Sequence, residues 1–210
     1  MNTNFKSPIV ILANGSFPNH SIPLEILESA GTVICTDGSA NSLEDLDLMP
    51  HVIIGDMDSF KETKAEFKGL KIHDPNQENT DLEKALDWAV MNKIQEITIL
   101  GATGLREDLA MVNHYILFHY YDALKLEMVT DHFTITCHRG QKSFDAFPGE
   151  TVSLITQRFG TVVSTTALHY PLDNSILDPS TLAVSNKSLG DTFSVNASEP
   201  ILVFRGHPER

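Results

Sequence analysis

Short, unbroken runs of apolar and β-branched residues alternate with helical patterns through the first half of the chain. This alternation restricts the possible folds more than any other feature. The runs end at Gly, Asn or Asp, and they are Ile9–Leu12, Thr32–Thr36, His51–Ile54 and Ile97–Leu100, with Leu70–His73 as a further candidate. Unbroken runs of this length are typical of strands that are buried on both faces, as in a parallel sheet.

Two helices are predicted between these strands. The first has an apolar stripe at helical spacing, formed by Leu82, Ala85, Leu86, Ala89 and Val90. The second is expected from about 108 to 121, and its candidate core residues are Met111, Val112, Tyr115, Ile116 and Phe118. Strands that alternate with helices predict an open parallel α/β sheet of the Rossmann-like kind.

After about Asp131 the pattern changes to strands without helices. Runs such as Phe133–Cys137, Thr151–Ile155 and Ile201–Phe204 are separated by turn signals such as Pro148-Gly149. This pattern is typical of an all-β sandwich. We therefore expect two domains, an α/β domain over residues 1–130 and a β-sandwich domain over residues 131–210.

The composition and the cysteine spacing argue against several classes of function. Acidic residues outnumber basic ones, 28 to 15, and the net charge of −13 disfavours binding to nucleic acid. Cys35 and Cys137 lie far apart with no C-x-x-C spacing, so neither a disulfide framework nor a zinc site is expected. The longest early apolar run, Ile9–Ala13, is too short for a membrane span. We therefore expect a cytoplasmic protein that contacts neither nucleic acid nor membrane.

Carboxylates follow several of the predicted strands. In open α/β sheets, ligands bind at the carboxyl ends of the strands. Asp56 and Asp58 follow the third strand, and two carboxylates at this spacing can face one Mg²⁺ ion. The same pair is common in loops that hold no metal. Asp37, Asp81 and Asp108 are predicted at the same edge of the sheet, and their mutual repulsion favours a shared cation.

Two further segments allow a structural and a functional interpretation. Thr80 and Glu83 have the spacing of a helix capping box, which leaves Gln77 unexplained and Asp81 available to a cation. The segment Gly101–Asp108 follows a strand and opens a helix, so its glycines and its arginine could bind phosphates. Taken alone, that segment is explained as well by an ordinary solvated turn.

The order of these motifs resembles that of the thiamin pyrophosphokinases. The matching segments are Thr36–Asn41 for the family's ADGGAN, Gly55–Ser59 for GDxDS, Gln77–Lys84 for Q-x-x-TD-x-x-K, Gly101–Asp108 for GaxGGRxDH, and Tyr170–Leu172 with Ser185-Asn186 for YPL…SN. The resemblance covers most of the chain.

The resemblance implies an enzyme that uses Mg²⁺ to transfer a pyrophosphoryl group from ATP to the hydroxyl of thiamin. It also implies a homodimer with thiamin between the α/β half of one subunit and the β half of the other. By position, the metal ligands would be Asp56, Asp58, Asp81 and Asp108, and the first three would be the catalytic residues. The ATP and phosphate contacts would be Asp37, Asn41, Ser59, Gln77, Thr80, Lys84 and Arg106. Ser185 and Asn186 would contact thiamin.

Three positions depart from the family pattern. Ser39 and Leu105 replace glycines, and Leu109 replaces a histidine. Because residues other than glycine rarely adopt a positive φ, we expect Leu105 to avoid that conformation. Three alternative functions stay open: a pyrophosphokinase for another small alcohol such as a pterin, a non-catalytic nucleotide- or thiamin-binding module, and a protein whose aspartates only cap helices and face solvent.

Overall fold

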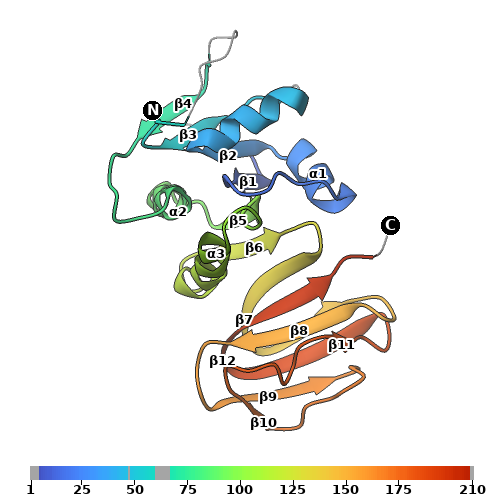
Figure 1. The fold of residues 1–210 in the computed structure, drawn as a ribbon. Coiled ribbons are helices and arrows are strands. Elements are labelled where there is room, and N and C mark those ends of the chain that lie inside the picture. Colours follow the sequence, from blue (N-terminus) through green and yellow to red (C-terminus); the bar gives the residue numbers. More distant parts are fainter. Residues whose placement is uncertain (1–4, 47, 60–66, 209–210) are drawn as a thin grey trace. The chain divides into compact units, whose positions relative to one another are not determined.

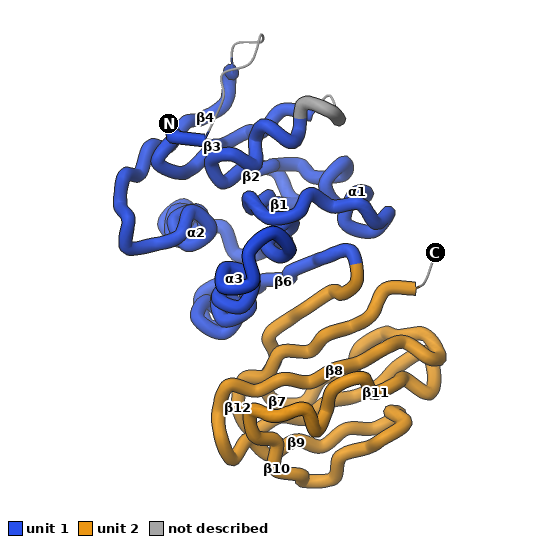
Figure 2. The backbone as a smooth tube through the Cα atoms, in the orientation of Figure 1, with its two compact units in different colours: residues 1–131 blue, residues 132–210 orange. Residues whose placement is uncertain are grey.

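The computed structural model describes residues 5–46, 48–59 and 67–208 (Figure 1). The chain divides into two compact units, residues 1–131 and 132–210 (Figure 2). Within the described ranges, none of the helices combines the length and the apolar character that crossing a bilayer requires.

The first unit is built on a parallel sheet in the order β4-β3-β2-β1-β5-β6. Its strands are β1 (Ile9–Leu12), β2 (Thr32–Thr36), β3 (Val52–Gly55), β4 (Leu70–His73), β5 (Glu96–Leu100) and β6 (Lys125–Val129). The strands predicted from apolar runs are all present. The sequence interpretation did not identify β6, because its apolar residues alternate with Lys125 and Glu127 and form no unbroken run.

The helical segments of this unit are α1 (Ser21–Glu28), the 3₁₀ segment η1 (Asp37–Leu46), α2 (Asp81–Met91) and α3 (Glu107–His119). The chain begins in the middle of the sheet at β1, runs outward to β4, and then returns to β5 on the other side of β1. The loops that follow β1 and β5 therefore leave in opposite directions. In open α/β sheets this reversal creates a crevice in which ligands bind.

The two longer helices differ in how well their sequence pattern predicted the buried face. Helix α2 buries the predicted stripe except for Val90, which is exposed. The prediction for α3 was wrong for Met111, Val112 and Tyr115, which are exposed. Apolar residues lie all around α3, so spacing alone did not identify the inward face. That face is formed by Asn113, Ile116, Leu117 and Tyr120, which follow one another at helical intervals.

The second unit consists of antiparallel strands, and its long last strand pairs with three of the others. The strands are β7 (Phe133–Asp145), β8 (Thr151–Thr156), β9 (Thr161–Thr166), β10 (Ser175–Leu177), β11 (Asn186–Lys187) and β12 (Thr192–Gly206). Strand β12 pairs with β7 along its length, with β9 through its first half and with β8 through its second half. The register shifts between Ala197 and Ile201. The runs Phe193–Val195 and Ile201–Phe204 are therefore two parts of a single strand.

The core of the second unit is apolar with one buried ion pair at its edge. Phe144 and Phe193 stack with their ring centroids 5.2 Å apart among aliphatic side chains. The buried Glu150 accepts a hydrogen bond from Arg205 Nε at 3.1 Å and another from the Phe147 backbone N–H at 3.2 Å. Burial raises the pKa of Glu150 even though the Arg205 guanidinium opposes the shift.

Candidate active site

Three carboxylates converge at the carboxyl ends of β2 and β3. One oxygen from each of Asp37, Asp56 and Asp58 lies within 4.8 Å of the others. The two strands are neighbours, with Thr36 paired to Ile54, so the residues that follow them lie side by side. Carboxylate oxygens are hard ligands of the kind that Mg²⁺ prefers, so this acidic cluster has the chemistry of a divalent cation site.

Hydrogen bonds hold the acidic cluster in place. The Ser59 backbone N–H donates to Asp37 Oδ2 at 3.0 Å, and the Ser59 hydroxyl donates to Asp58 Oδ1 at 2.8 Å. Gln77 Nε2 donates to Asp56 Oδ2 at 3.1 Å. This amide lowers the pKa of Asp56, whereas burial raises the pKa of Asp37. The cluster therefore contains one buried carboxylate and two that are open to solvent.

Gly55 allows two acidic side chains to approach the end of β3. Its φ of +154° favours glycine, and a Cβ at this position would lie 2.8 Å from Asp37 Cβ and 3.2 Å from Asp81 Cγ. Asp81 therefore lies beside the acidic cluster without belonging to the group of three. Its Oδ1 accepts a hydrogen bond from Lys84 Nζ at 2.8 Å, and Lys84 is buried.

The remaining predicted metal ligand is paired differently. Asp108 lies in the first turn of α3, where its Oδ2 is 2.6 Å from Arg106 Nη2 and its Oδ1 is 3.1 Å from Arg106 Nε. This ion pair is exposed, and the Arg106 guanidinium lowers the pKa of Asp108. Among the residues that the structure describes, the group of three carboxylates includes Asp37 in place of Asp81 and Asp108.

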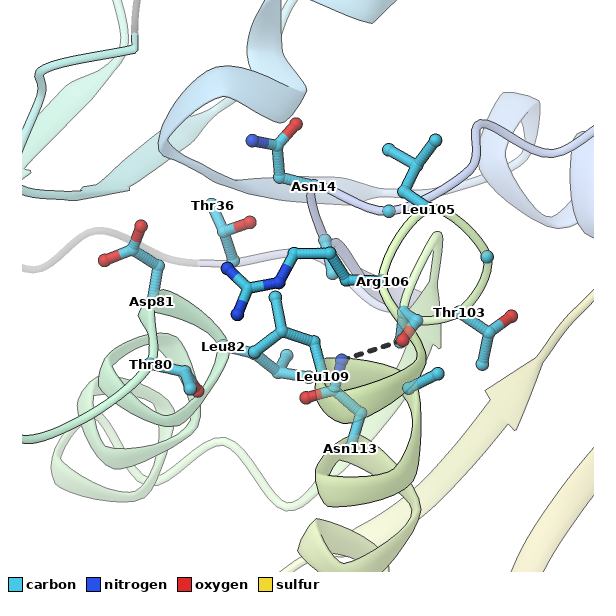
Figure 3. Close-up of a pocket in the computed structure, with 15 residues that line it drawn as sticks. Asn14, Thr36, Thr80, Asp81, Leu82, Thr103, Leu105, Arg106, Leu109 and Asn113 are labelled. Carbon is cyan, nitrogen blue, oxygen red and sulfur yellow. Dashed lines mark hydrogen bonds between the residues drawn. The ribbon is translucent and has the colours of Figure 1, made fainter.

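A pocket of about 240 Å³ opens in the first unit where the sheet reverses direction (Figure 3). Five parts of the chain form its wall: the loop after β1, the end of β2, the start of α2, the loop after β5 and one face of α3. Two of its lining residues are neighbours of the acidic cluster: Thr36 directly precedes Asp37, and Asp81 lies beside the cluster at Gly55. The pocket and the cluster are therefore adjacent parts of one site at the carboxyl edge of the sheet.

Backbone hydrogen bonds join the two loops that line the pocket, the one after β1 and the one after β5. Gly15 N donates to Gly101 O at 2.7 Å, and Ser16 N donates to Thr103 O at 2.8 Å. Gly104 has a φ of +85°, and a Cβ there would lie 2.0 Å from Ser16 Oγ. This packing leaves no room for a side chain at position 104, so the close contact between the two loops requires glycine there.

The expectation for Leu105 was wrong. Its φ is +31°, in the left-handed region that residues other than glycine rarely occupy. The side chain is 75% exposed, so no packing opposes this backbone turn into α3. The leucine that replaces a glycine of the family pattern thus has a positive φ, at a cost in backbone strain of about 1–3 kcal/mol.

Other predicted residues of the first unit support this arrangement. Asn41 Nδ2 donates to Ser59 O at 2.9 Å, next to the acidic cluster. Thr80 caps α2: its hydroxyl accepts from Glu83 N at 3.3 Å, and Thr80 N donates to Glu83 Oε2 at 3.1 Å. The predicted capping box is confirmed, and Thr80 also lines the pocket.

The two predicted thiamin contacts lie in the second unit. Ser185 has a φ of +62°, and its backbone N–H donates to Ser153 Oγ at 2.9 Å. Asn186 is buried, and its amide bonds to both the N–H and the carbonyl of Tyr170, at 3.0 Å and 2.7 Å. The Asn186 amide therefore joins two segments of this unit.

Sequence reasoning missed several residues that line the pocket. Asn14, Thr103 and Asn113 are polar, and none of them was singled out. Asn113 left the clearest signal, because it is an amide on the apolar side of a predicted helix. Burial of a polar side chain usually requires a hydrogen bond, and Asn113 Nδ2 donates to Ala102 O at 2.7 Å.

Comparisons with known proteins point to one family. A family model described as "Thiamin pyrophosphokinase, catalytic domain" matches residues 24–129, just over half of the chain. The chain is 26% identical over 161 residues to thiamin pyrophosphokinase 1 of Caenorhabditis elegans. The matched region covers 69% of this chain and 66% of that relative, just under two thirds of its length.

Solved structures are similar over nearly the whole chain. The thiamin pyrophosphokinase of Geobacillus thermodenitrificans is 27% identical with a TM-score of 0.79, and the match covers 96% of this chain and 97% of that one. The Bacillus subtilis enzyme has a TM-score of 0.82 at 24% identity, with 96% and 99% covered. From the family model, the motifs and this likeness of fold, we conclude that the chain belongs to the thiamin pyrophosphokinase family.

Proposed function

We propose that this protein is a thiamin pyrophosphokinase that forms thiamin diphosphate and AMP from thiamin and ATP. The observation that carries the proposal is the acidic cluster beside a pocket at the point where the sheet reverses. In the reaction, the thiamin hydroxyl oxygen bonds to the β-phosphorus, and the bond from that phosphorus to the oxygen bridging to the α-phosphorus breaks. The bridging oxygen leaves with AMP, and the hydroxyl loses its proton.

The residues present fit a Mg²⁺ ion. Asp37, Asp56 and Asp58 would hold it, since their oxygens converge and hydrogen bonds fix two of them to Ser59. Bound there, the ion would neutralise charge on the phosphates and polarise them. Asp37 thus takes the ligand role that the sequence suggested for Asp108, while Asp108 orients Arg106.

Basic groups of the chain would position the phosphates. Lys84 is buried beside Asp81, and Arg106 lies on the pocket wall, where Figure 3 shows its guanidinium extending toward Thr36 and Asp81. Both cations can offset the negative charge that moves to the leaving AMP. Lys84 occupies Asp81 Oδ1, which leaves Asp81 Oδ2 to accept the proton of the thiamin hydroxyl.

The remaining parts of the proposal rest on the family resemblance. Residues 1–130 would be a Rossmann-like nucleotide-binding domain, which the parallel strand order supports. Residues 131–210 would be a β-sandwich that binds thiamin through Ser185, with Asn186 shaping the loop around Tyr170. The enzyme would act in the cytoplasm as a homodimer, with each thiamin held between an α/β half and the β half of the other subunit.

Incubation of the protein with ATP, Mg²⁺ and thiamin tests the proposal, and AMP and thiamin diphosphate should appear in equal amounts. Asp56→Asn should lower kcat by about 100-fold or more, because a metal ligand is lost while the size of the side chain is kept. Asp122→Asn, at an exposed position outside the site, is the matched control and should retain full activity. AMP release only with a hydroxymethyl pterin, or binding without any AMP release, would contradict the proposal.

A further inference from the structure

Asn113 places a hydrogen-bond acceptor of fixed orientation in the pocket wall. Its side chain is 8% exposed, and Nδ2 donates to Ala102 O at 2.7 Å. A backbone carbonyl can only accept, so the amide must direct its NH₂ group toward Ala102 and its Oδ1 elsewhere. Figure 3 shows Oδ1 on the opposite side of the amide, toward Leu82.

Oδ1 of Asn113 has no hydrogen-bond partner within the described part of the chain, although the residue is a lining residue of the pocket. Among the described residues, Asn113 Oδ1 is not one of the side-chain atoms that are both fully buried and unpaired, so this oxygen is accessible from the pocket although the residue as a whole is buried. An acceptor that is held in one orientation and is open to a cavity is available to a donor on a ligand.

The surroundings of Asn113 indicate what kind of ligand carries that donor. Leu82 and Leu109 present aliphatic surface to the pocket near Asn113, and the Arg106 guanidinium lies toward Thr36 and Asp81. Aliphatic surface of this kind suits the faces of a flat heteroaromatic ring, and one polar group at the wall then fixes the ring's orientation. An acceptor that cannot donate selects an N–H group over a ring carbonyl.

We infer that Asn113 is a specificity-determining residue whose Oδ1 accepts a hydrogen bond from the exocyclic amino group of a heteroaromatic ring bound in this pocket. The inference rests on the proposed function, because both proposed substrates carry such a group: the adenine of ATP and the aminopyrimidine of thiamin. An oxo group at the same position would face Oδ1 with a second acceptor and leave both oxygens unpaired.

Substrate analogues test the inference with the full-length protein. We would measure kcat/KM for ATP against ITP, and for thiamin against the analogue whose pyrimidine amino group is replaced by an oxo group. The wild-type protein should discriminate in one of the two pairs by about tenfold or more, since a bound oxo compound would cover Oδ1 without giving it a donor. The pair that shows the discrimination identifies which substrate occupies this part of the site.

Asn113→Ala should reduce that ratio to near one, because no oriented acceptor remains. Asn92→Ala is the matched control: Asn92 also donates its amide to a backbone carbonyl at a helix, Trp88 O at 2.8 Å, but it does not line the pocket. Its discrimination should equal that of the wild type. If Asn113→Ala does not fold, Asn113→Leu fills a similar volume and carries no acceptor.

A purely structural Asn113 would lower kcat/KM for the amino and the oxo compound by the same factor. An unchanged ratio in both pairs would therefore overturn the inference while leaving the proposed function intact. If the wild-type protein forms no AMP with thiamin, the proposed function fails separately. Calorimetric binding of AMP and IMP to the wild type and to Asn113→Ala then tests, without turnover, whether Asn113 recognises the adenine amino group. The same ratio of AMP to IMP affinity in the two proteins would overturn that recognition of adenine.

Discussion

Replacing Gly55 by alanine should disable the proposed metal site through a single methyl group. The added Cβ would lie 2.8 Å from Asp37 Cβ, whereas carbon atoms pack at about 3.5–4.0 Å. Asp37 must therefore move by roughly 0.7 Å or more, and Asp81, with its Cγ at 3.2 Å, must also shift. The φ of +154° adds backbone strain of about 1–3 kcal/mol.

A displacement of this size at a reacting centre costs about 100-fold in rate. We therefore expect Gly55→Ala to lower kcat/KM by about 100-fold and to weaken Mg²⁺ binding, as measured by AMP release across a Mg²⁺ titration. Gly160→Ala is the control, because Gly160 also has a positive φ, +74°, but no atom within 4 Å of the added Cβ. It should lose stability and keep its activity. Normal turnover in Gly55→Ala, or an equal loss in both variants, would refute the reasoning.

Three further substitutions probe other parts of the molecule. Lys84→Met keeps the buried aliphatic part of the side chain and removes the ammonium group. The value of kcat/KM should therefore fall by roughly 10- to 100-fold in the AMP assay. An unchanged kcat/KM would exclude Lys84 from phosphate binding. Thr80→Ala removes the cap of α2 and should lower the free energy of unfolding by about 1 kcal/mol in a denaturant titration. Burial raises the pKa of Glu150 in the folded state above its ordinary value of 4.5. The protonated side chain therefore contributes stability that is complete below pH 4.5 and is lost as pH rises through the folded-state pKa. Glu150→Gln lacks this titration, and thermal unfolding should show the wild type losing stability relative to the variant as pH rises from about 4, whereas a constant difference would contradict the assignment.

The sequence predicted β1, β2 and β3 because all of their residues are buried and their apolar character is therefore unbroken. Strand β6 was missed because Lys125 and Glu127 interrupt its apolar residues. Helix α3 was located but given the wrong inward face, since Met111, Val112 and Tyr115 are as apolar as the residues that pack inside. The single strand β12 could not be distinguished from two strands, because its register shift lies where Pro200 interrupts the pattern.

For the candidate site, the sequence identified the acidic residues but not how they group. Asp56 and Asp58 could be paired by their spacing alone. The convergence of Asp37 with them depends on β2 and β3 being neighbours, and strand order is a property of the sheet that local sequence does not encode. The pairing of Asp108 with Arg106 is likewise a rotamer choice that composition cannot reveal. At Leu105 the general rule that residues other than glycine avoid a positive φ gave a wrong prediction.

The position of β12 has a consequence for how the protein is made. This strand, residues 192–206, lies between β7 on one side and β8 and β9 on the other, and in the described part of the second unit it is the strand with which all three pair. A nascent polypeptide that ends before Thr192 lacks the element that joins them, and their apolar faces stay uncovered. The first unit can fold during translation, whereas the second must wait for its last strand to leave the ribosome and depends on protection from aggregation until then.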